Sequence, residues 1–165
     1  MSTEGSPVDD RRGVAGGEGV RVVVIAARFN SEITEPLLRG AREALVEHGV
    51  RPEDVTEIRV PGAWELPSTA AQAVASRRFD AVITLGCVIR GETPHFDFVC
   101  QEASRGLGSV ARASNVPVVF GVLTTDDLAQ AQARAGEGKD NKGYEAAMAA
   151  LEMVPVYLSL LGDQT

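Results

Sequence analysis

The chain has few of the residues on which metal centres and disulfide scaffolds depend. Of its 165 residues, two are cysteine and two are histidine. A metal site needs more Cys or His side chains in a suitable spacing, so we expect no metal ion and no metal cofactor. Cys87 and Cys100 are better explained as two free thiols in a reducing compartment than as a disulfide. We therefore expect a cytoplasmic protein.

Long apolar runs and an excess of positive charge are also missing. No stretch approaches the roughly 18–20 apolar residues that span a bilayer, and the polar N-terminal residues lack the apolar segment of a signal peptide. The formal net charge is −7, which argues against nucleic acid or a membrane surface as the main partner. Any anion site must then rely on local donors and a few placed cations.

The length and composition predict one globular domain, since 44% of the residues are hydrophobic and 24% are charged. Residues 1–19 are rich in Gly, Ser, Asp and Glu and show no apolar period. We interpret them as a flexible N-terminal arm, or as one that becomes ordered only against a neighbouring chain. Residues 20–165 are predicted to form the domain.

Apolar runs and helical patterns alternate four times in this domain. The runs at 21–27, 55–60, 80–85 and 117–123 predict strands. Helices are predicted from about 34 to 48 with Pro36 in the first turn, at 67–77, from 94 to about 113, from 126, and from about 141 to 160. This alternation predicts an α/β fold of the three-layer, flavodoxin-like type, with a four-stranded parallel sheet and helices on both faces.

The most informative segment is Gly86-Cys87-Val88-Ile89-Arg90-Gly91-Glu92-Thr93-Pro94-His95-Phe96-Asp97, which follows the third predicted strand. Thr93 is expected to be a hydroxyl N-cap, with Pro94 as the first helical residue. A helix start offers unpaired N–H groups and the positive end of the dipole to an anion. His95, of a type that titrates near neutral pH, lies beside it. Together they suggest proton transfer on a small phosphorylated substrate.

The other predicted strand ends carry polar or aromatic residues as well: Phe29-Asn30, the block 61–65 and the run 123–125. Open parallel sheets bind ligands at these carboxyl ends, so we expect all four ends to converge. Phe29 and Trp64 could be core residues, or platforms on which a flat heterocycle stacks. Glu65 could favour the dipole of the next helix, or hold the hydroxyls of a polyol.

A structural explanation competes with the functional one at each candidate. His95 could be a helix-terminal histidine without chemistry, although its place at a strand end favours catalysis. Arg90 and Arg134 are either counter-charges for an anion or solvated arginines. Lys142 opposes the dipole at a predicted helix start, which hints at a substrate contact. His48 is better explained as a cation at a helix end, and residues 106–111 match a dinucleotide fingerprint only inside a predicted helix, so we discard it.

Several motifs in order resemble the lumazine synthase family of riboflavin biosynthesis, over residues 21–157. They are Phe29-Asn30, Pro61-Gly62-Ala63-Trp64-Glu65-Leu66-Pro67, Gly91-Glu92-Thr93-Pro94-His95-Phe96-Asp97, Leu123-Thr124-Thr125, Arg134-Ala135-Gly136 and Asn141-Lys142-Gly143. The resemblance implies condensation of 5-amino-6-ribitylamino-2,4-pyrimidinedione with 3,4-dihydroxy-2-butanone 4-phosphate, without cofactor or metal. The products would be 6,7-dimethyl-8-ribityllumazine, phosphate and water.

The resemblance also implies a role for each matching residue. His95 would be the general acid and base, and Phe29 would stack on the pyrimidine ring. The phosphate would be held by Gly91, Glu92, Thr93 and the cation Arg134. The ring and the ribityl chain would be lined by Asn30, Ala63, Trp64 and Glu65, with backbone contacts from Val88 and Ile89 and a polar contact from Lys142.

In this family the site lies between subunits, which implies that Phe120 and Arg134 come from the adjacent chain. Phe120 lies inside a predicted strand and would otherwise be taken as a core residue. The resemblance thus implies a homo-oligomer that is at least a pentamer. The short loop 134–142 resembles the corresponding loop of family members that form icosahedral shells of twelve pentamers. Whether such a shell would enclose riboflavin synthase stays open. The alternatives are a flavin- or lumazine-binding module without catalysis, and a mainly structural shell protein.

Overall fold

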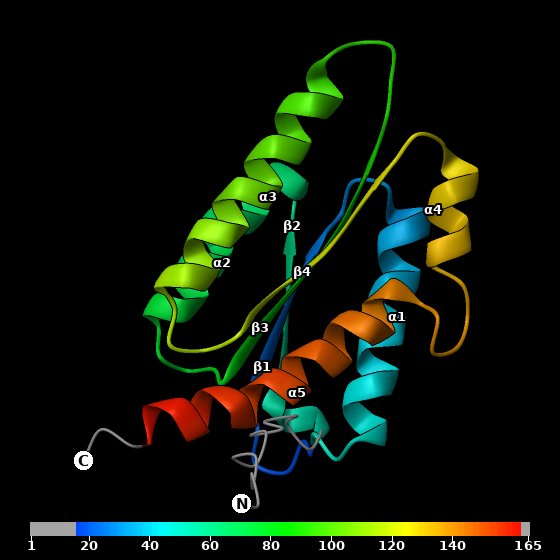
Figure 1. Ribbon diagram of the computed structural model, residues 1–165. Helices are drawn as coiled ribbons and strands as arrows, with labels where there is room; N and C mark the ends of the chain where they lie inside the picture. Colours follow the sequence, from blue (N-terminus) through cyan, green and yellow to red (C-terminus); the bar gives the residue numbers. More distant parts are fainter. Residues whose placement is uncertain (1–15, 163–165) are drawn as a thin grey trace, which may run out of the picture.

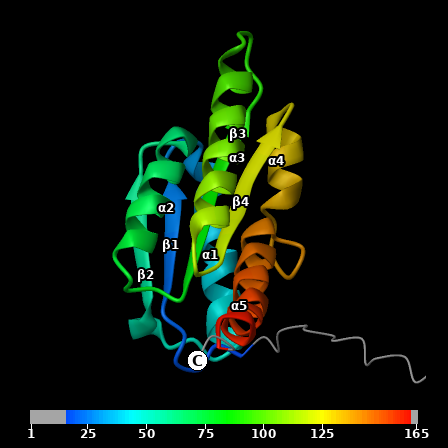
Figure 2. The same cartoon turned by 60° about the vertical axis from the view of Figure 1, so that its left-hand side comes forward.

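The computed structural model describes residues 16–162, in which four parallel strands and five α-helices follow one another (Figure 1). The sheet has the order β2-β1-β3-β4, which can be followed across Figure 2. This confirms the predicted α/β class. The strands are β1 (Val22–Ala27), β2 (Val55–Val60), β3 (Ala81–Ile89) and β4 (Val118–Thr125), and the helices are α1 (Ser31–Glu47), α2 (Leu66–Ala75), α3 (His95–Ala113), α4 (Leu128–Arg134) and α5 (Lys142–Leu161).

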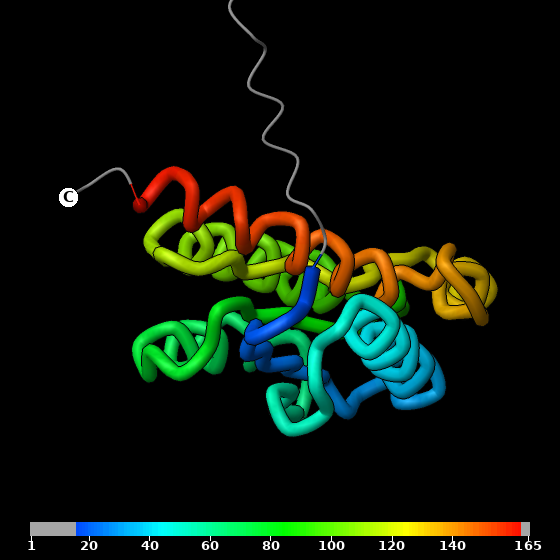
Figure 3. The backbone as a smooth tube through the Cα atoms, turned by 90° about the horizontal axis from the view of Figure 1, so that it is seen from below, coloured from blue at the N-terminus to red at the C-terminus, as the bar shows by residue number. Residues whose placement is uncertain are grey.

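The sheet is the middle of three layers and is covered on both faces. Val22 and Val24 of β1 pack among residues of α1 and α5, whereas Val23 and Ile25 pack among residues of α2 and α3. Successive side chains of a strand point to opposite faces, so each core takes every second residue. On one face α5 lies against α1 (Figures 1 and 3). An all-apolar strand such as β1 is therefore buried on both sides, as the sequence predicts.

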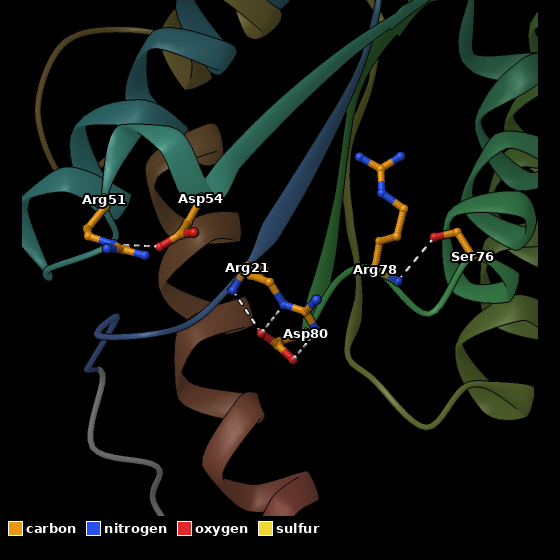
Figure 4. Close-up of polar contacts among 6 residues, drawn as sticks. All are labelled: Arg21, Arg51, Asp54, Ser76, Arg78 and Asp80. Atoms are coloured by element: carbon orange, nitrogen blue, oxygen red, sulfur yellow. Dashed lines mark hydrogen bonds and ion pairs between the residues drawn. The ribbon is translucent and has the colours of Figure 1, made fainter.

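The start of β1 is held beside the start of β3 by Arg21 and Asp80 (Figure 4). The backbone N–H of Arg21 donates to Asp80 Oδ2 at 2.8 Å, and the guanidinium contacts the same carboxylate at 3.4 and 3.5 Å. The Asp80 N–H in turn donates to the Arg21 carbonyl at 2.7 Å. These contacts fix the register of the two central strands at the end of the sheet away from the candidate site.

The start of α5 is explained largely by its contacts with α1. Asn141 Oδ1 accepts hydrogen bonds from the N–H groups of Gly143 and Tyr144 at 2.8 and 3.1 Å, so Asn141 caps the helix. Its amide donates to the Pro36 carbonyl at 3.1 Å. A Cβ at Gly143 would overlap the Leu37 carbonyl, so only glycine allows the two helices to approach this closely. Two residues of the Asn141-Lys142-Gly143 motif thus have structural roles.

Several element boundaries differ from the sequence expectation. β3 continues to Ile89 and β4 to Thr125, because Gly86 does not end β3 and the two strands stay paired from Val82↔Val118 to Ile89↔Thr125. Helix α1 begins at Ser31 rather than near 34, so Pro36 lies in its interior and not in its first turn. The cause is Asn30, which occupies the N-cap position in a left-handed conformation, a start signal that the sequence pattern does not reveal.

The predicted N-terminal arm lies mostly outside the described residues, which begin at 16. Gly17, however, falls within its predicted range of 1–19 and is buried. Its N–H donates to the carbonyl of His48 at 2.7 Å, and a Cβ there would overlap Val50. Gly17 therefore packs on the end of α1, whereas residues 16, 18 and 19 are exposed, and the arm as a whole stays a prediction. His48 itself is the C-cap of α1, with Nδ1 2.8 Å from the Ala44 carbonyl oxygen.

Helix α5 is long and apolar enough, by length and composition alone, to cross a membrane. The expectation that no stretch approaches this limit was therefore wrong. A core helix of a globular domain passes the same test, and α5 packs on α1, β3 and β4. Seven of its residues are buried: Gly143, Tyr144, Ala146, Ala147, Ala150, Leu151 and Val154. The absence of a membrane partner stays a prediction.

Candidate active site

A cavity of about 450 Å³ lies at the carboxyl ends of β1 and β3, beside the start of α3. The strand order reverses between β1 and β3, and ligands of open parallel sheets bind at such points. Fourteen residues line it: Phe29, Pro61, Gly62, Ala63, Trp64, Glu65, Cys87, Val88, Ile89, Gly91, Thr93, His95, Phe96 and Val99. Nine of them belong to the residue set predicted from the sequence.

Two large aromatic side chains of this cavity remain open to solvent. Phe29 is 70% exposed and Trp64 is 57% exposed, although both are hydrophobic. Phe29 follows β1, and Trp64 lies in the short 3-10 turn η2 (Ala63–Glu65) after β2. The core explanation for them is therefore wrong, and their rings are free to stack on a flat ligand.

Glu65 places its carboxylate in the same cavity and has a structural contact there. Its Oε2 accepts a hydrogen bond of 2.9 Å from the N–H of Gly62. This contact closes the turn before α2 and fixes the carboxyl group. The other oxygen, Oε1, has no hydrogen-bond partner among residues 16–162. Glu65 can thus hold the turn and accept a hydrogen bond from a ligand hydroxyl at once.

His95 is the first residue of α3, is exposed, and lines the cavity. The predicted cap is wrong: Pro94 occupies the N-cap position, and no side chain caps the helix. The reason is that the Pro94 carbonyl, not that of Thr93, accepts the first bonds, from Asp97 N–H at 3.0 Å and Phe98 N–H at 3.4 Å. Among residues 16–162 the Thr93 hydroxyl consequently has no hydrogen-bond partner, and Thr93 lines the cavity.

Asn30 is not among the residues that line this cavity, but it contacts one that is. Its side-chain amide donates a hydrogen bond of 2.9 Å to the carbonyl of Cys87 in β3. Its own carbonyl accepts bonds from Ile33 and Thr34 at the start of α1. Both groups are committed to the fold, so Asn30 shapes the wall of the cavity. Glu92, also predicted as a site residue, is exposed and lines no cavity described in the structure.

The remaining predicted residues line a different cavity of about 410 Å³ beside the edge strand β4. Phe120 of β4, Arg134 of α4 and Lys142 of α5 are among its lining residues, together with the run 121–125. All four strands end at one edge of the sheet, and Arg90 after β3 contacts Asp126 after β4 at 2.9 Å, so the ends lie together as expected. The last residues of β4, however, line this second cavity, whereas residues after the other three strands border the cavity of His95.

The cations of this second cavity are held by their own helices. Arg134 Nη1 donates to the Gln130 carbonyl at 2.9 Å, a contact that stabilises the end of α4. Lys142 Nζ donates to Glu145 Oε2 at 2.8 Å, which offsets its unfavourable place at the start of α5. Phe120 is 46% exposed despite its place in a strand. Within one chain, none of the three borders the cavity of His95.

Some residues of the first cavity were not expected from the sequence. Phe96 and Val99 line it from α3, and their spacing to the buried Ala103 and Leu107 marks one helix face, a signal that could have found them. Cys87 lines it from β3 and is 3% exposed. Burial raises the pKa of this thiol to about 11, so at neutral pH Cys87 is not a nucleophile.

No three His, Cys, Asp or Glu side chains gather as metal ligands would in the part of the chain that the structure describes. The discarded glycine pattern at 106–111 lies inside α3, which confirms that it is no dinucleotide loop. What the geometry supports is a cavity with an aromatic platform, a carboxylate, a helix start and an adjacent histidine. That set suits binding of a heterocycle and proton transfer near an anionic group.

Comparison with known proteins agrees with this geometry. The sequence model of the 6,7-dimethyl-8-ribityllumazine synthase family matches residues 19–157. A 6,7-dimethyl-8-ribityllumazine synthase of Gemmatimonas aurantiaca is 52% identical over 141 residues, which cover 86% of each chain. The match includes every residue that lines the two cavities. The chain therefore belongs to the 6,7-dimethyl-8-ribityllumazine synthase family.

Proposed function

We propose that this chain catalyses the reaction for which its family is named. It condenses 5-amino-6-ribitylamino-2,4-pyrimidinedione with 3,4-dihydroxy-2-butanone 4-phosphate to give 6,7-dimethyl-8-ribityllumazine, phosphate and water. The observation that carries the proposal is the single cavity in which His95 at a helix start, the exposed rings of Phe29 and Trp64, and the Glu65 carboxylate meet.

The reaction needs several proton transfers, and His95 is the group placed to make them. The amine of the pyrimidine attacks the ketone and a first water leaves to give an imine, phosphate is then eliminated, and the second nitrogen closes the ring with loss of a second water. His95 moves the protons, while the N–H groups at the start of α3 and the Thr93 hydroxyl bind the phosphate. Much of the remaining acceleration comes from holding the two reactants in one cavity.

We propose that the second cavity completes the site of an adjacent subunit. Phe120, Arg134 and Lys142 border an open hollow beside the edge of the sheet, away from His95 of the same chain. A homo-oligomer, a pentamer as in the family resemblance, would bring Arg134 to the phosphate and Phe120 to the ring. Assembly into twelve pentamers and enclosure of riboflavin synthase stay proposals that rest on the resemblance alone, and a cytoplasmic location stays a proposal that rests on the two free thiols.

The test is a reaction of the purified full-length chain with both substrates. We expect the fluorescence of the lumazine product to rise together with one phosphate per product, and neither signal when one substrate is left out. The absence of product at saturating substrate concentrations contradicts the proposal. Tight binding of riboflavin or of the lumazine without phosphate release would identify the alternative, a binding module on the same fold.

A further inference from the structure

The turn between β3 and α3 has little support of its own. Residues 90–94 are all exposed, and the turn projects beyond the end of the sheet at the top of Figures 1 and 2. Within residues 16–162, the side chains of Glu92 and Thr93 form no hydrogen bond. A Cβ placed at Gly91 would meet nothing within 4 Å. The contacts that fix the position of the turn must therefore be made by the residues at its two ends.

One end of this turn is held by Arg90, whose side chain contacts two separate elements. Its Nε donates to Asp126 Oδ1 at 2.9 Å, just after β4. Its Nη1 lies 3.7 Å from Asp97 Oδ1, and its Cζ lies 4.4 Å from the centre of the Phe96 ring. Its backbone N–H donates to the Thr125 carbonyl at 2.8 Å. Arg90 thus joins the first turn of α3 to the end of β4.

The turn that contains Asp126, unlike the one before α3, is well anchored. The Asp126 N–H donates to Gln130 Oε1 at 2.9 Å. The hydroxyl of Thr125 donates to the Asp127 carbonyl at 3.0 Å, and Asp127 Oδ1 accepts the Gln130 N–H at 2.8 Å. The carboxylate that receives Arg90 therefore belongs to a turn fixed by three hydrogen bonds at the start of α4.

We propose that Arg90 is a positioning residue, which ties the unsupported turn and the first turn of α3 to the anchored turn after β4. Phe96 lines the cavity and is adjacent to His95, so this tie sets where His95 and the N–H groups of the helix start lie. The guanidinium is already occupied by Asp126, Asp97 and the Phe96 ring. Arg90 is then not a phosphate cation, although the sequence allowed that role.

The expected effect is local. The side chains of Arg90 and Asp126 are 49% and 66% exposed, and ion pairs with this exposure add little to global stability. Loss of the tie should leave the urea midpoint nearly unchanged while it loosens the turn. A small displacement of catalytic groups is enough to slow a reaction strongly. The kinetic consequence rests on the proposed function, whereas the loosening of the turn does not.

The test compares Arg90→Gln, Arg90→Lys, Asp126→Asn and the double variant Arg90→Gln/Asp126→Asn. Matched controls are Arg51→Gln and Asp54→Asn, whose Nε–carboxylate contact of 2.8 Å (Figure 4) lies just before the start of β2, at the opposite end of the strand from the cavity. The side chains of Arg51 and Asp54 are 63% and 16% exposed. Each full-length protein is assayed for kcat, for KM of the butanone phosphate, and for hydrogen exchange of the amides at 91–98.

We expect Arg90→Gln and Asp126→Asn each to lower kcat about 10-fold and to speed exchange at 91–98. The double variant should be no worse than either single variant, because the three changes remove the same contact. Arg90→Lys keeps the charge without the planar fork and should recover part of kcat. The Arg51 and Asp54 controls should match the wild type.

Two results would overturn the proposal. If Arg90 binds phosphate directly, Arg90→Gln raises KM for the butanone phosphate, whereas Asp126→Asn frees the guanidinium and leaves that KM unchanged or lower. If exchange at 91–98 in Arg90→Gln equals that of the wild type, there is no tie. A wild-type chain without turnover contradicts the proposed function, and the exchange measurement still decides the role of Arg90.

Discussion

The side-chain amide of Asn30 donates a hydrogen bond of 2.9 Å to the carbonyl oxygen of Cys87 and so joins the end of β1 to β3. Asn30 makes this contact from a left-handed backbone conformation, with φ 61° and ψ 48°. Asparagine and glycine adopt this conformation more readily than other residues. The contact lies where the candidate active site begins, because Phe29, the residue before Asn30, and Cys87 both line its cavity.

Asn30→Gly should therefore be milder than Asn30→Ala. Both variants lose the hydrogen bond, at about 1 kcal/mol, but only alanine also strains the backbone, at about 1–2 kcal/mol. Urea unfolding of the two variants and the wild type measures the difference. Equal destabilisation by alanine and glycine would show that the left-handed conformation of residue 30 does not limit the choice of side chain.

His95→Ala should slow turnover much more than it weakens binding. Removal of a general acid and base costs about 10²- to 10⁴-fold in kcat, whereas a ribityl-pyrimidine analogue is held mainly by the aromatic platform and Glu65. His48→Ala is the matched control, because His48 lies at the end of α1 and lines neither cavity. If the affinity for the analogue and kcat fall by the same factor in His95→Ala, the histidine has a structural role.

Mixing two inactive variants should restore activity if sites are shared between subunits. His95→Ala and Arg134→Gln are each expected to be slow alone. In rings assembled randomly from equal amounts of both, about one interface in four combines an intact His95 with an intact Arg134. Activity near this fraction of the wild type, measured after joint refolding, supports shared sites. A mixture no more active than its components places Arg134 and His95 of each site in the same chain, or leaves Arg134 without a role.

Alkylation of Cys87 should be slow until the solution is strongly alkaline. Burial raises the pKa of its thiol from an ordinary 9.0 to about 11, and only the thiolate reacts. Between pH 9.0 and about pH 11, the Cys87 thiol is deprotonated in the unfolded chain but still protonated in the folded chain. Its contribution to the free energy of unfolding therefore falls as the pH rises through this range.

The rate of Cys87 alkylation is measured by iodoacetamide labelling followed by mass spectrometry, with the urea-unfolded chain as control. Equal rates at pH 8 in the folded and unfolded chains would contradict the burial argument.

Much of the fold and half of the site follow from local sequence patterns. The all-apolar run of β1 predicts a strand buried on both faces, and residues after β1, β2 and β3 meet at one cavity because parallel strands end at one edge. The Thr93 cap failed because the choice between Thr93 and Pro94 as first acceptor depends on the geometry of an exposed turn. Such turns receive few constraints from the core.

Other features lie outside any local pattern. The hydrogen bond from Asn30 to Cys87 joins residues 57 positions apart, and a single sequence does not reveal this pairing. The separation of Phe120 from His95 also depends on the three-dimensional structure: Phe120 is the third residue of the edge strand β4 and pairs with Thr84 of β3, not with the end of that strand. The family resemblance, not the strand pattern, placed Phe120 in a site.

His95 and Phe120 line separate cavities of the chain. In the proposed assembly, folding therefore involves one chain, whereas a complete active site requires two chains to associate. After dilution from denaturant, the far-ultraviolet circular dichroism of the chain should recover at a rate independent of concentration. Product formation should instead show a lag that shortens as the chain concentration rises, because subunit association is a second-order process. The rate of product formation in the cell then depends on the concentration of the chain in two ways. The concentration sets the number of sites, and it also sets the fraction of those sites that is complete.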